Sequence, residues 1–226
     1  MPSVTRLAVF DVDGTLVDSQ HNIVASMVRA CERNGLAAPA PETIRRIIGL
    51  SLLEAVTTLL PDTAPELVLR VVEEYKKGFQ ELRARADHFE PLFPGVMEAL
   101  DTLEAGGWTL AVATGKSRRG LLMMIERHGL TGRFVSLQTA DDNPGKPHPA
   151  MLRRAIDEAG ARPAEAVMIG DTSYDMQMGR SAGVRAIGVA WGYHAPAELL
   201  AAGADLVVEN YPHLVGLLPT LFVQAQ

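Results

Sequence analysis

Cysteine is nearly absent from this sequence, since Cys31 is the single one in 226 residues. One cysteine cannot form a disulfide within the chain or a cysteine-rich metal site. Cys31 falls on the apolar side of a helical pattern, which predicts that it packs in a core. No apolar run approaches the ~20 residues of a membrane-spanning helix, and the first residues lack the pattern of a signal peptide. These absences predict a cytoplasmic protein.

Clusters of basic residues are also missing, and the chain carries a net charge of −6. Proteins that bind nucleic acid or anionic membranes usually present a stripe of lysine and arginine, so neither is expected as the main partner. Small anions can still bind locally. The composition, 47% hydrophobic and 21% charged, is that of a globular chain rather than a disordered one. The length fits one large domain or two modest ones, and we expect a monomer or a homodimer.

The most informative stretch covers residues 7–19 and reads Leu-Ala-Val-Phe-Asp-Val-Asp-Gly-Thr-Leu-Val-Asp-Ser. An apolar run typical of a buried parallel strand leads into Asp11 and Asp13. Gly14 opens the turn that follows, and its backbone N–H groups are expected to face a bound anion, with Gly14 and Thr15 as phosphate-binding residues. The stretch therefore predicts a site for phosphate and metal.

A carboxylate beside a phosphate needs a cation, because the two negative charges repel unless a hard ion withdraws charge from the oxygens. Asp11 therefore predicts Mg²⁺. Mutual repulsion would raise the pKa of one carboxyl group, so that Asp13 can give a proton to a leaving alkoxide. A calcium loop also begins Asp-x-Asp, but its glycine and glutamate positions are occupied here by Leu16 and Asn22, which excludes an EF-hand.

After this stretch the sequence pattern becomes purely helical. Apolar residues keep a helical period in four successive segments, which end near Gly35, Gly49, Pro61 and Leu82. Ser51 and Glu54 have the spacing of a capping box at the start of the third segment. Helices grouped between strands suggest a separate unit. We therefore expect an inserted all-helical domain over residues 18–88, hinged near Asp18 and near residues 88–91.

From Pro94 onward strands and helices alternate, which predicts a parallel sheet built from right-handed crossovers. Beside the first strand at 7–10, strands are expected at 109–113, 134–138, 166–169, 186–189 and 205–208, and helices at 96–105, 118–128, 150–159, 197–202 and 214–221. Residues 1–17 and 89–226 together predict a discontinuous α/β core domain.

Polar residues follow several of these strands. Thr114, Lys146, Asp171 and Asp175 each follow a strand or lie in a strand-to-helix loop, as Asp11 does. Taken singly, they would be read as a helix cap, a surface lysine and turn residues. Ligands of parallel sheets bind beyond the carboxyl ends of the strands. The shared placement therefore predicts that all of them converge on one site.

Four motifs stand in order along nearly the full length of the chain. They read Asp-Val-Asp-Gly-Thr at 11–15, Ala-Thr-Gly-Lys at 113–116, Gly-Lys-Pro-His-Pro at 145–149 and Gly-Asp-Thr-Ser-Tyr-Asp at 170–175. In this combination the chain resembles phosphohydrolases of the haloacid dehalogenase superfamily, in the phosphoglycolate-phosphatase-like subgroup. The resemblance implies a Rossmann-like core, an inserted helical (C1-type) cap, and hydrolysis of a small phosphorylated metabolite through an aspartyl-phosphate intermediate.

The carboxylates then take separate roles. Asp11 is expected to attack phosphorus, and Mg²⁺ to be held by the Asp11 carboxylate, the backbone carbonyl of Asp13 and the carboxylate of Asp171. Asp13 would protonate the leaving oxygen and then deprotonate the water that hydrolyses the intermediate.

Other groups would bind the phosphate. Lys146 is expected to be a fixed positive charge beside Asp11, while the Thr114 hydroxyl and neighbouring amides, including that of Gly115, hold the phosphate oxygens. Asp175 would orient Lys146 or the waters on the metal.

Substrate recognition is expected to involve Lys116 and, in the cap, Arg45, Arg46 and Gly49. Gly49 permits close backbone approach, so its turn can be lowered over the phosphate. A guanidinium from Arg45 or Arg46 would clamp the carboxylate of a small acid, and the resemblance makes 2-phosphoglycolate the leading substrate. Each of the three basic residues can equally be read as a solvated charge on a helix surface.

Other functions stay open at this point. Dehalogenases and phosphonatases of this superfamily replace the second aspartate, which is present here as Asp13. A sugar-phosphate mutase similar to beta-phosphoglucomutase is disfavoured, because such enzymes usually lack Thr15 and carry a basic residue in place of Leu52. Pyrophosphate, other sugar phosphates and nucleotides are alternative substrates. A non-catalytic binding protein would lack a carboxylate or the lysine. Residues 115–117 are similar to the end of a P-loop, but Leu110 replaces its first glycine.

Overall fold

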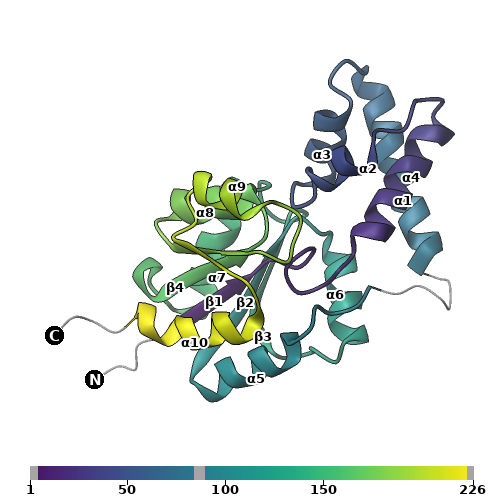
Figure 1. The fold of residues 1–226 in the computed structure, drawn as a ribbon. Coiled ribbons are helices and arrows are strands. Elements are labelled where there is room, and N and C mark those ends of the chain that lie inside the picture. Colours follow the sequence, from purple (N-terminus) through teal and green to yellow (C-terminus); the bar gives the residue numbers. More distant parts are fainter. Residues whose placement is uncertain (1–4, 84–89, 223–226) are drawn as a thin grey trace.

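A computed structural model describes residues 5–83 and 90–222 of the chain. Within these residues six parallel strands form one sheet in the order β3-β2-β1-β4-β5-β6 (Figure 1). The strands are β1 (Arg6–Phe10), β2 (Trp108–Thr114), β3 (Phe134–Thr139), β4 (Ala166–Gly170), β5 (Arg185–Val189) and β6 (Leu206–Val208). The order reverses between β1 and β4, which is the place where doubly wound sheets bind their ligands.

β1 explains why the sheet is covered on both faces. Residues Leu7–Phe10 of this strand are all apolar and fully buried, and they alternate between two cores: Ala8 and Phe10 belong to one apolar cluster, Leu7 and Val9 to the other. Successive side chains of a strand point to opposite faces, so a continuous apolar strand requires a helical layer on each side.

Helices supply these two layers. Figure 1 shows α5 (Val96–Ala105) and α10 (Tyr211–Leu221) along one face, and together with α6 (Arg118–Arg127) they contribute to the apolar cluster that contains Phe10. On the other face, α7 (Ala150–Ala159) and α8 (Ser173–Ala182) contribute to the cluster that contains Val9. The short helix α9 (Pro196–Ala201) packs beside α8. A 3₁₀ turn, Pro163–Glu165, precedes β4. The α/β fold with a Rossmann-like sheet predicted from the sequence is confirmed.

Four further helices, called here the helical unit, stand beside the sheet at the upper right of Figure 1. They are α1 (Gln20–Arg33), α2 (Pro41–Arg45), α3 (Leu52–Leu59) and α4 (Pro65–Arg83). They enclose an apolar cluster of their own, in which Cys31 is fully buried, so the prediction that this cysteine packs in a core is confirmed. The predicted capping box is also present, with Ser51 and Glu54 each bonding the other's backbone N–H.

The chain enters and leaves the helical unit through two neighbouring segments. Val17 forms an antiparallel bridge with Leu92, and the Asp18 N–H donates to the carbonyl of Pro91 at 2.9 Å. The predicted hinge at Asp18 thus adjoins Pro91, while residue 88 of the second hinge lies outside the described residues. Residues 17–18 and 91–92, where the chain passes between the helical unit and the core, therefore lie side by side and are joined through their backbones.

In the core, element ends match the sequence predictions or differ from them by at most three residues. The largest shift is at α10, which begins at Tyr211 rather than at 214. The Asn210 side chain accepts a hydrogen bond from the His213 N–H and caps the helix earlier, and Tyr211 is buried against the core. Among the described residues, no helix has both the length and the apolar character needed to cross a membrane.

Candidate active site

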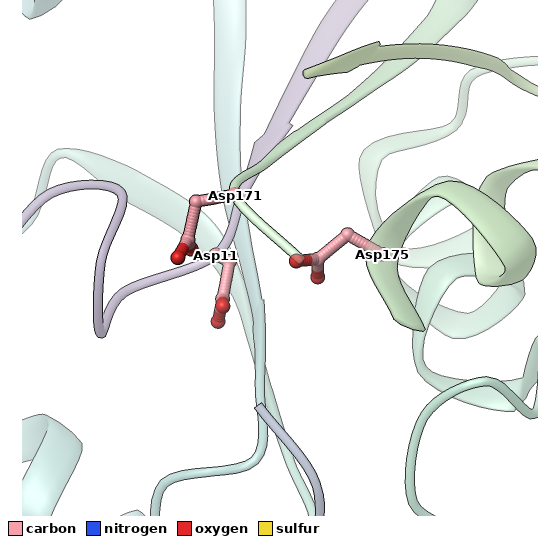
Figure 2. A group of neighbouring side chains, drawn as sticks. All are labelled: Asp11, Asp171 and Asp175. Atoms are coloured by element: carbon pink, nitrogen blue, oxygen red, sulfur yellow. The ribbon is translucent and has the colours of Figure 1, made fainter. Parts of the chain in front are cut away.

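Three carboxylates meet where β1 and β4 end. Asp11 follows β1, Asp171 follows β4, and Asp175 lies in the first turn of α8, as Figure 2 shows. Phe10 and Ile169 are paired in the sheet, so Asp11, one residue after Phe10, and Asp171, two residues after Ile169, emerge at the same edge. One oxygen from each of the three aspartates lies within 4.8 Å of the others, and all three residues are buried. The convergence predicted from the strand ends is present in the structure.

Lys146 is the counter-charge of this carboxylate cluster. It comes from the loop before α7, is fully buried, and places Nζ 2.8 Å from Asp11 Oδ1 and 2.6 Å from Asp175 Oδ1. Asp175 thus contacts Lys146, one of the groups that it was expected to orient. Three carboxylates and one ammonium group leave two negative charges uncompensated when all four groups are ionised. A buried excess charge of this kind is costly unless a cation joins it.

The pKa values of the buried groups reflect this excess of negative charge. Burial raises the pKa of Asp11 from 3.8 to about 7, with Lys146 lowering it and Asp175 raising it further. Burial, together with the charges of Asp11 and Asp175, raises the pKa of Asp171 well above its usual range. Burial acts to lower the pKa of Lys146, but Asp11 and Asp175 outweigh it and raise that pKa. The lysine therefore stays charged, while Asp11 without a further cation binds a proton near neutral pH.

These residues fit a divalent cation. Asp11 Oδ2 is buried and has no hydrogen-bond partner among the described residues, so one oxygen of the cluster is available as a ligand. The donors are carboxylate oxygens, the type that Mg²⁺ binds, and two positive charges would neutralise the cluster. Asp11 and Asp171 lie in the cluster as expected of ligands, whereas the side chain of Asp13 lies outside it.

Two glycines leave room for Asp171. A Cβ on Gly14 would lie 2.1 Å from Asp171 Oδ2, and a Cβ on Gly192 would lie 2.1 Å from Asp171 Cβ. Gly14 also has a φ of +89°, a conformation that side chains other than glycine rarely adopt. No larger residue fits at either position, so both glycines help to place this carboxylate.

Gly14 and Thr15 are placed differently from the prediction that they bind phosphate. Their amides donate within the turn, to the carbonyls of Val17 and Val12 at 2.9 and 3.2 Å. The Thr15 hydroxyl donates to Asp171 Oδ1 at 2.9 Å. The turn is too tight to present these donors outward, and Thr15 instead fixes the orientation of Asp171.

Asp13 belongs to a second polar group beside the carboxylate cluster. Its Oδ1 accepts hydrogen bonds from Lys116 Nζ and from Ser19 Oγ, each at 2.6 Å. Tyr193 OH in turn accepts from the Ser19 N–H at 3.2 Å. Lys116 is only 9% exposed, so its alternative reading as a solvated surface lysine is wrong. The lysine reaches the carboxylate that was assigned to proton transfer.

Sequence reasoning missed the loop of residues 191–194, which follows β5. The Tyr193 N–H donates to Asp171 Oδ2 at 2.9 Å, and the Trp191 indole donates to the carbonyl of Thr15 at 3.1 Å. This loop lies at the carboxyl end of a strand, as the other site residues do. The same strand-end rule, applied to Gly192 and its aromatic neighbours, would have found it.

A cavity of about 620 Å³ lies between the helical unit and this edge of the sheet. Asp11, Asp13, Thr114, Gly115 and Lys116 reach it from the core. Thr114 and Gly115 thus occupy the place expected for phosphate contacts. The Thr114 hydroxyl also accepts a hydrogen bond from the Lys116 N–H at 3.2 Å.

The turn at Gly49 closes one side of the cavity. A Cβ on Gly115 would lie 2.6 Å from the carbonyl oxygen of Gly49 and 2.5 Å from that of Leu50, so the two backbones are in direct contact. Gly49 itself has a φ of +104° and faces Thr172. The close approach expected of Gly49 is therefore present, with the turn seated against the core.

The two arginines before this turn lie elsewhere. Arg45 Nε donates to Gln20 Oε1 at 2.9 Å, and Arg46 Nη2 lies 2.6 Å from Glu198 Oε1 of α9. Neither lines the cavity. The expectation that one of them receives a substrate carboxylate is corrected, because α2 directs Arg45 toward α1 and Arg46 toward the core surface.

Comparisons with known proteins agree with this geometry. The family model described as haloacid dehalogenase-like hydrolase matches residues 8–189. A relative named "Probable phosphatase IndB" from Dickeya dadantii is 37% identical, over 93% of this chain and 92% of its own length. A protein named phosphoglycolate phosphatase from Agrobacterium fabrum is 29% identical, over 97% of this chain and 93% of its own length.

A solved structure shows the same fold. A hydrolase from Pseudomonas syringae superposes with a TM-score of 0.85 at 27% identity and covers 96% of this chain and 99% of its own. The family match extends from β1 to β5 and so includes every strand end that contributes to the carboxylate cluster. The chain therefore belongs to the family of haloacid dehalogenase-like hydrolases, which confirms the resemblance and the enzyme class predicted from its sequence.

Proposed function

We propose that this protein is a Mg²⁺-dependent phosphatase that hydrolyses a small phosphorylated metabolite through an aspartyl-phosphate intermediate. The observation that supports it most directly is the excess of two negative charges in a buried cluster at the ligand-binding edge of the sheet. A divalent cation would neutralise this excess, and the cluster also contains Asp11, a carboxylate that reaches the cavity. A phosphatase of this family needs both features in one place.

In the proposed reaction Asp11 attacks phosphorus, while Lys146, 2.8 Å away, holds it in position and offsets its charge. Mg²⁺, held by Asp11, Asp171 and the backbone carbonyl of Asp13, would supply Lewis-acid activation of the phosphate. The Thr114 hydroxyl and the Gly115 backbone bind the phosphate oxygens.

Proton transfer is assigned to Asp13. Its carboxylate reaches the cavity and is separate from the cluster, so it can exchange a proton without releasing the metal. It protonates the leaving oxygen in the first step and takes a proton from water in the second. Lys116 and Ser19 hold this carboxylate in place through their hydrogen bonds.

Residues 18–88 are proposed to act as a cap domain on a core made of residues 1–17 and 89–226. The separate apolar cluster of the helical unit and the backbone contact between Asp18 and Pro91 support this division. The seating of Gly49 against Gly115 supports closure of the cap over the phosphate, which would exclude water from the reaction.

The substrate is proposed as a phosphate monoester. The resemblance favours 2-phosphoglycolate, but the arginines expected to bind its carboxylate do not line the cavity. A sugar-phosphate mutase is the alternative. It is disfavoured because the apolar Leu52 lines the cavity at the position where mutases carry a basic residue.

Phosphate release from a panel of monoesters, measured with Mg²⁺ and with EDTA, tests the proposal. Turnover should require Mg²⁺, and Asp11→Asn should lower it by at least about 10⁴-fold, because the variant keeps the shape but not the nucleophilic charge. Asp62→Asn, an exposed aspartate of the helical unit, is the control and should keep the parent rate. Activity of the Asp11 variant near the parent's would refute the covalent mechanism.

A further inference from the structure

The cavity is large for the substrates that the resemblance suggests. Its volume of about 620 Å³ falls in the range of pockets that take drug-sized ligands. 2-Phosphoglycolate and pyrophosphate have about nine non-hydrogen atoms each, far fewer than a drug-sized ligand. Either would occupy the phosphate end and leave most of the cavity to water.

Most of the wall on the side of the helical unit is apolar. Met27 of α1, Ile48 of the turn before α3, and Val72, Tyr75 and Phe79 of α4 line the cavity on the side of the helical unit. They belong to the apolar cluster of that unit. Water against such a wall is unfavourable, and an apolar group of the substrate that displaced it would gain binding energy.

Cations are poorly placed to receive a second acidic group. Lys116 is already paired with Asp13, and Lys76, which is exposed, pairs with Glu73 at 2.7 Å. Arg119 also reaches the cavity, but from an exposed position on α6. Lys76 and Gln80 of α4 also line the cavity, at exposed positions beside Tyr75 and Phe79. The buried part of the wall, formed by Met27, Ile48, Val72 and Phe79, therefore offers no charged partner to a carboxylate or a phosphate.

One aromatic ring of the wall lies near the lysine that is paired with the proposed acid, and a second ring lies beside the first. The rings of Tyr75 and Phe79 have centroids 5.6 Å apart. Lys116 Nζ lies 5.8 Å from the centre of the Phe79 ring and 2.6 Å from Asp13 Oδ1. A leaving group that takes the proton of Asp13 starts beside Lys116 and can extend toward the Phe79 ring, and a flat ring packs well against aromatic side chains.

Building on the function proposed above, we infer that the preferred substrate is a phosphate monoester of a ring-bearing, largely apolar alcohol, whose ring lies against Tyr75 and Phe79. The phosphate occupies the core side, at Asp11 and Thr114. This class differs from 2-phosphoglycolate in size and in the absence of a carboxylate.

A pair of esters with matched leaving groups tests this inference. Ethyl phosphate and 2-phenylethyl phosphate both release a primary alcohol, so they differ chiefly in the ring. With Mg²⁺ present, kcat/KM for 2-phenylethyl phosphate should exceed that for ethyl phosphate and for 2-phosphoglycolate by at least about tenfold, since even one methylene group in an apolar pocket can be worth that much.

Variants then locate the ring. Tyr75→Ala should reduce the ratio of the two kcat/KM values by about fivefold or more, and Phe79→Leu, which keeps an apolar side chain in the buried position, should reduce it as well. Leu69→Ala is the matched control, because Leu69 lies on the same helix but is 53% exposed and outside the cavity. Its ratio should equal that of the parent.

The outcomes separate the two proposals. Mg²⁺-dependent turnover of ethyl phosphate or 2-phosphoglycolate, without preference for the ring, would overturn this inference and leave the phosphatase function standing. A preference that survived in both aromatic variants would also overturn it, because the ring would then bind elsewhere. Absence of turnover on every ester would refute the proposed function and this inference together.

Discussion

The two walls of the cavity are built on different principles. The core wall carries charged side chains that form ion pairs, namely Asp13 with Lys116 and Asp11 with Lys146. The wall of the helical unit carries apolar side chains from several helices. The comparison teaches that the reaction is encoded at strand ends, whereas the choice of substrate depends on which helix faces point inward.

This difference has a geometric cause. β1 and β4 are neighbours, so any residue that immediately follows either strand must emerge at the same edge. On a short helix, by contrast, one residue changes direction by about 100°. Arg45 and Arg46, adjacent in sequence, contact Gln20 of α1 and Glu198 of α9, in two different directions.

The largest effect that bears on this comparison is expected for Asp13→Asn. The variant should lose kcat by about 10²–10⁴-fold, the range of general acid–base catalysis. Its affinity for Mg²⁺, measured by calorimetry, should stay near the parent's, because the Asp13 side chain lies outside the carboxylate cluster. Loss of Mg²⁺ binding would place that side chain among the metal ligands and join the two polar groups into one.

A smaller effect is expected on stability. The pKa of Asp11 is about 7 in the folded protein and 3.8 ordinarily, so without metal the folded state binds a proton more tightly than the unfolded chain. The free energy of unfolding should therefore fall as the pH rises from about 4 to about 7. The Asp11→Asn variant has no such ionisable group, so its free energy of unfolding should not show this fall. In EDTA at pH 8 the variant should therefore be more stable than the parent by roughly 1–4 kcal/mol.

Denaturant titrations of both proteins at pH 5 and pH 8 would measure this difference, with Asp62→Asn as the exposed control. The gain should shrink at pH 5, where the parent carboxyl is largely protonated. Added Mg²⁺ should stabilise the parent more at pH 8 than at pH 5, since protons compete for the ligands. A gain of equal size at both pH values would show that burial of charge at Asp11 is not its cause.

The smallest effects are expected at the two arginines. Because neither lines the cavity, Arg45→Ala and Arg46→Ala should each change kcat/KM by less than about fivefold, and equally for 2-phosphoglycolate and a neutral aryl phosphate. The exposed pair of Arg46 with Glu198 contributes little to stability in water. A large loss confined to 2-phosphoglycolate would restore carboxylate recognition by this segment and break the distinction between the two walls.

The sequence by itself determined the sheet and most of the catalytic side. An uninterrupted apolar strand demands cover on both faces, and the strand-end rule collects Asp11, Thr114, Lys146 and Asp171 without any knowledge of distances. The capping box of Ser51 and Glu54 is equally local. These features depend on neighbours in sequence or on one regular geometry, and both can be read from a pattern.

Only the tertiary structure decided the partners of the polar groups. The pairing of Lys116 with Asp13, the use of Thr15 to hold Asp171, and the approach of residues 191–194 to the site each join elements far apart in sequence. The apolar wall has the same origin, because α1 and α4 must pack together before Met27 and Phe79 share a cavity. The spacing of apolar residues along the sequence does not predict such contacts, because they depend on how separate helices and strands pack together.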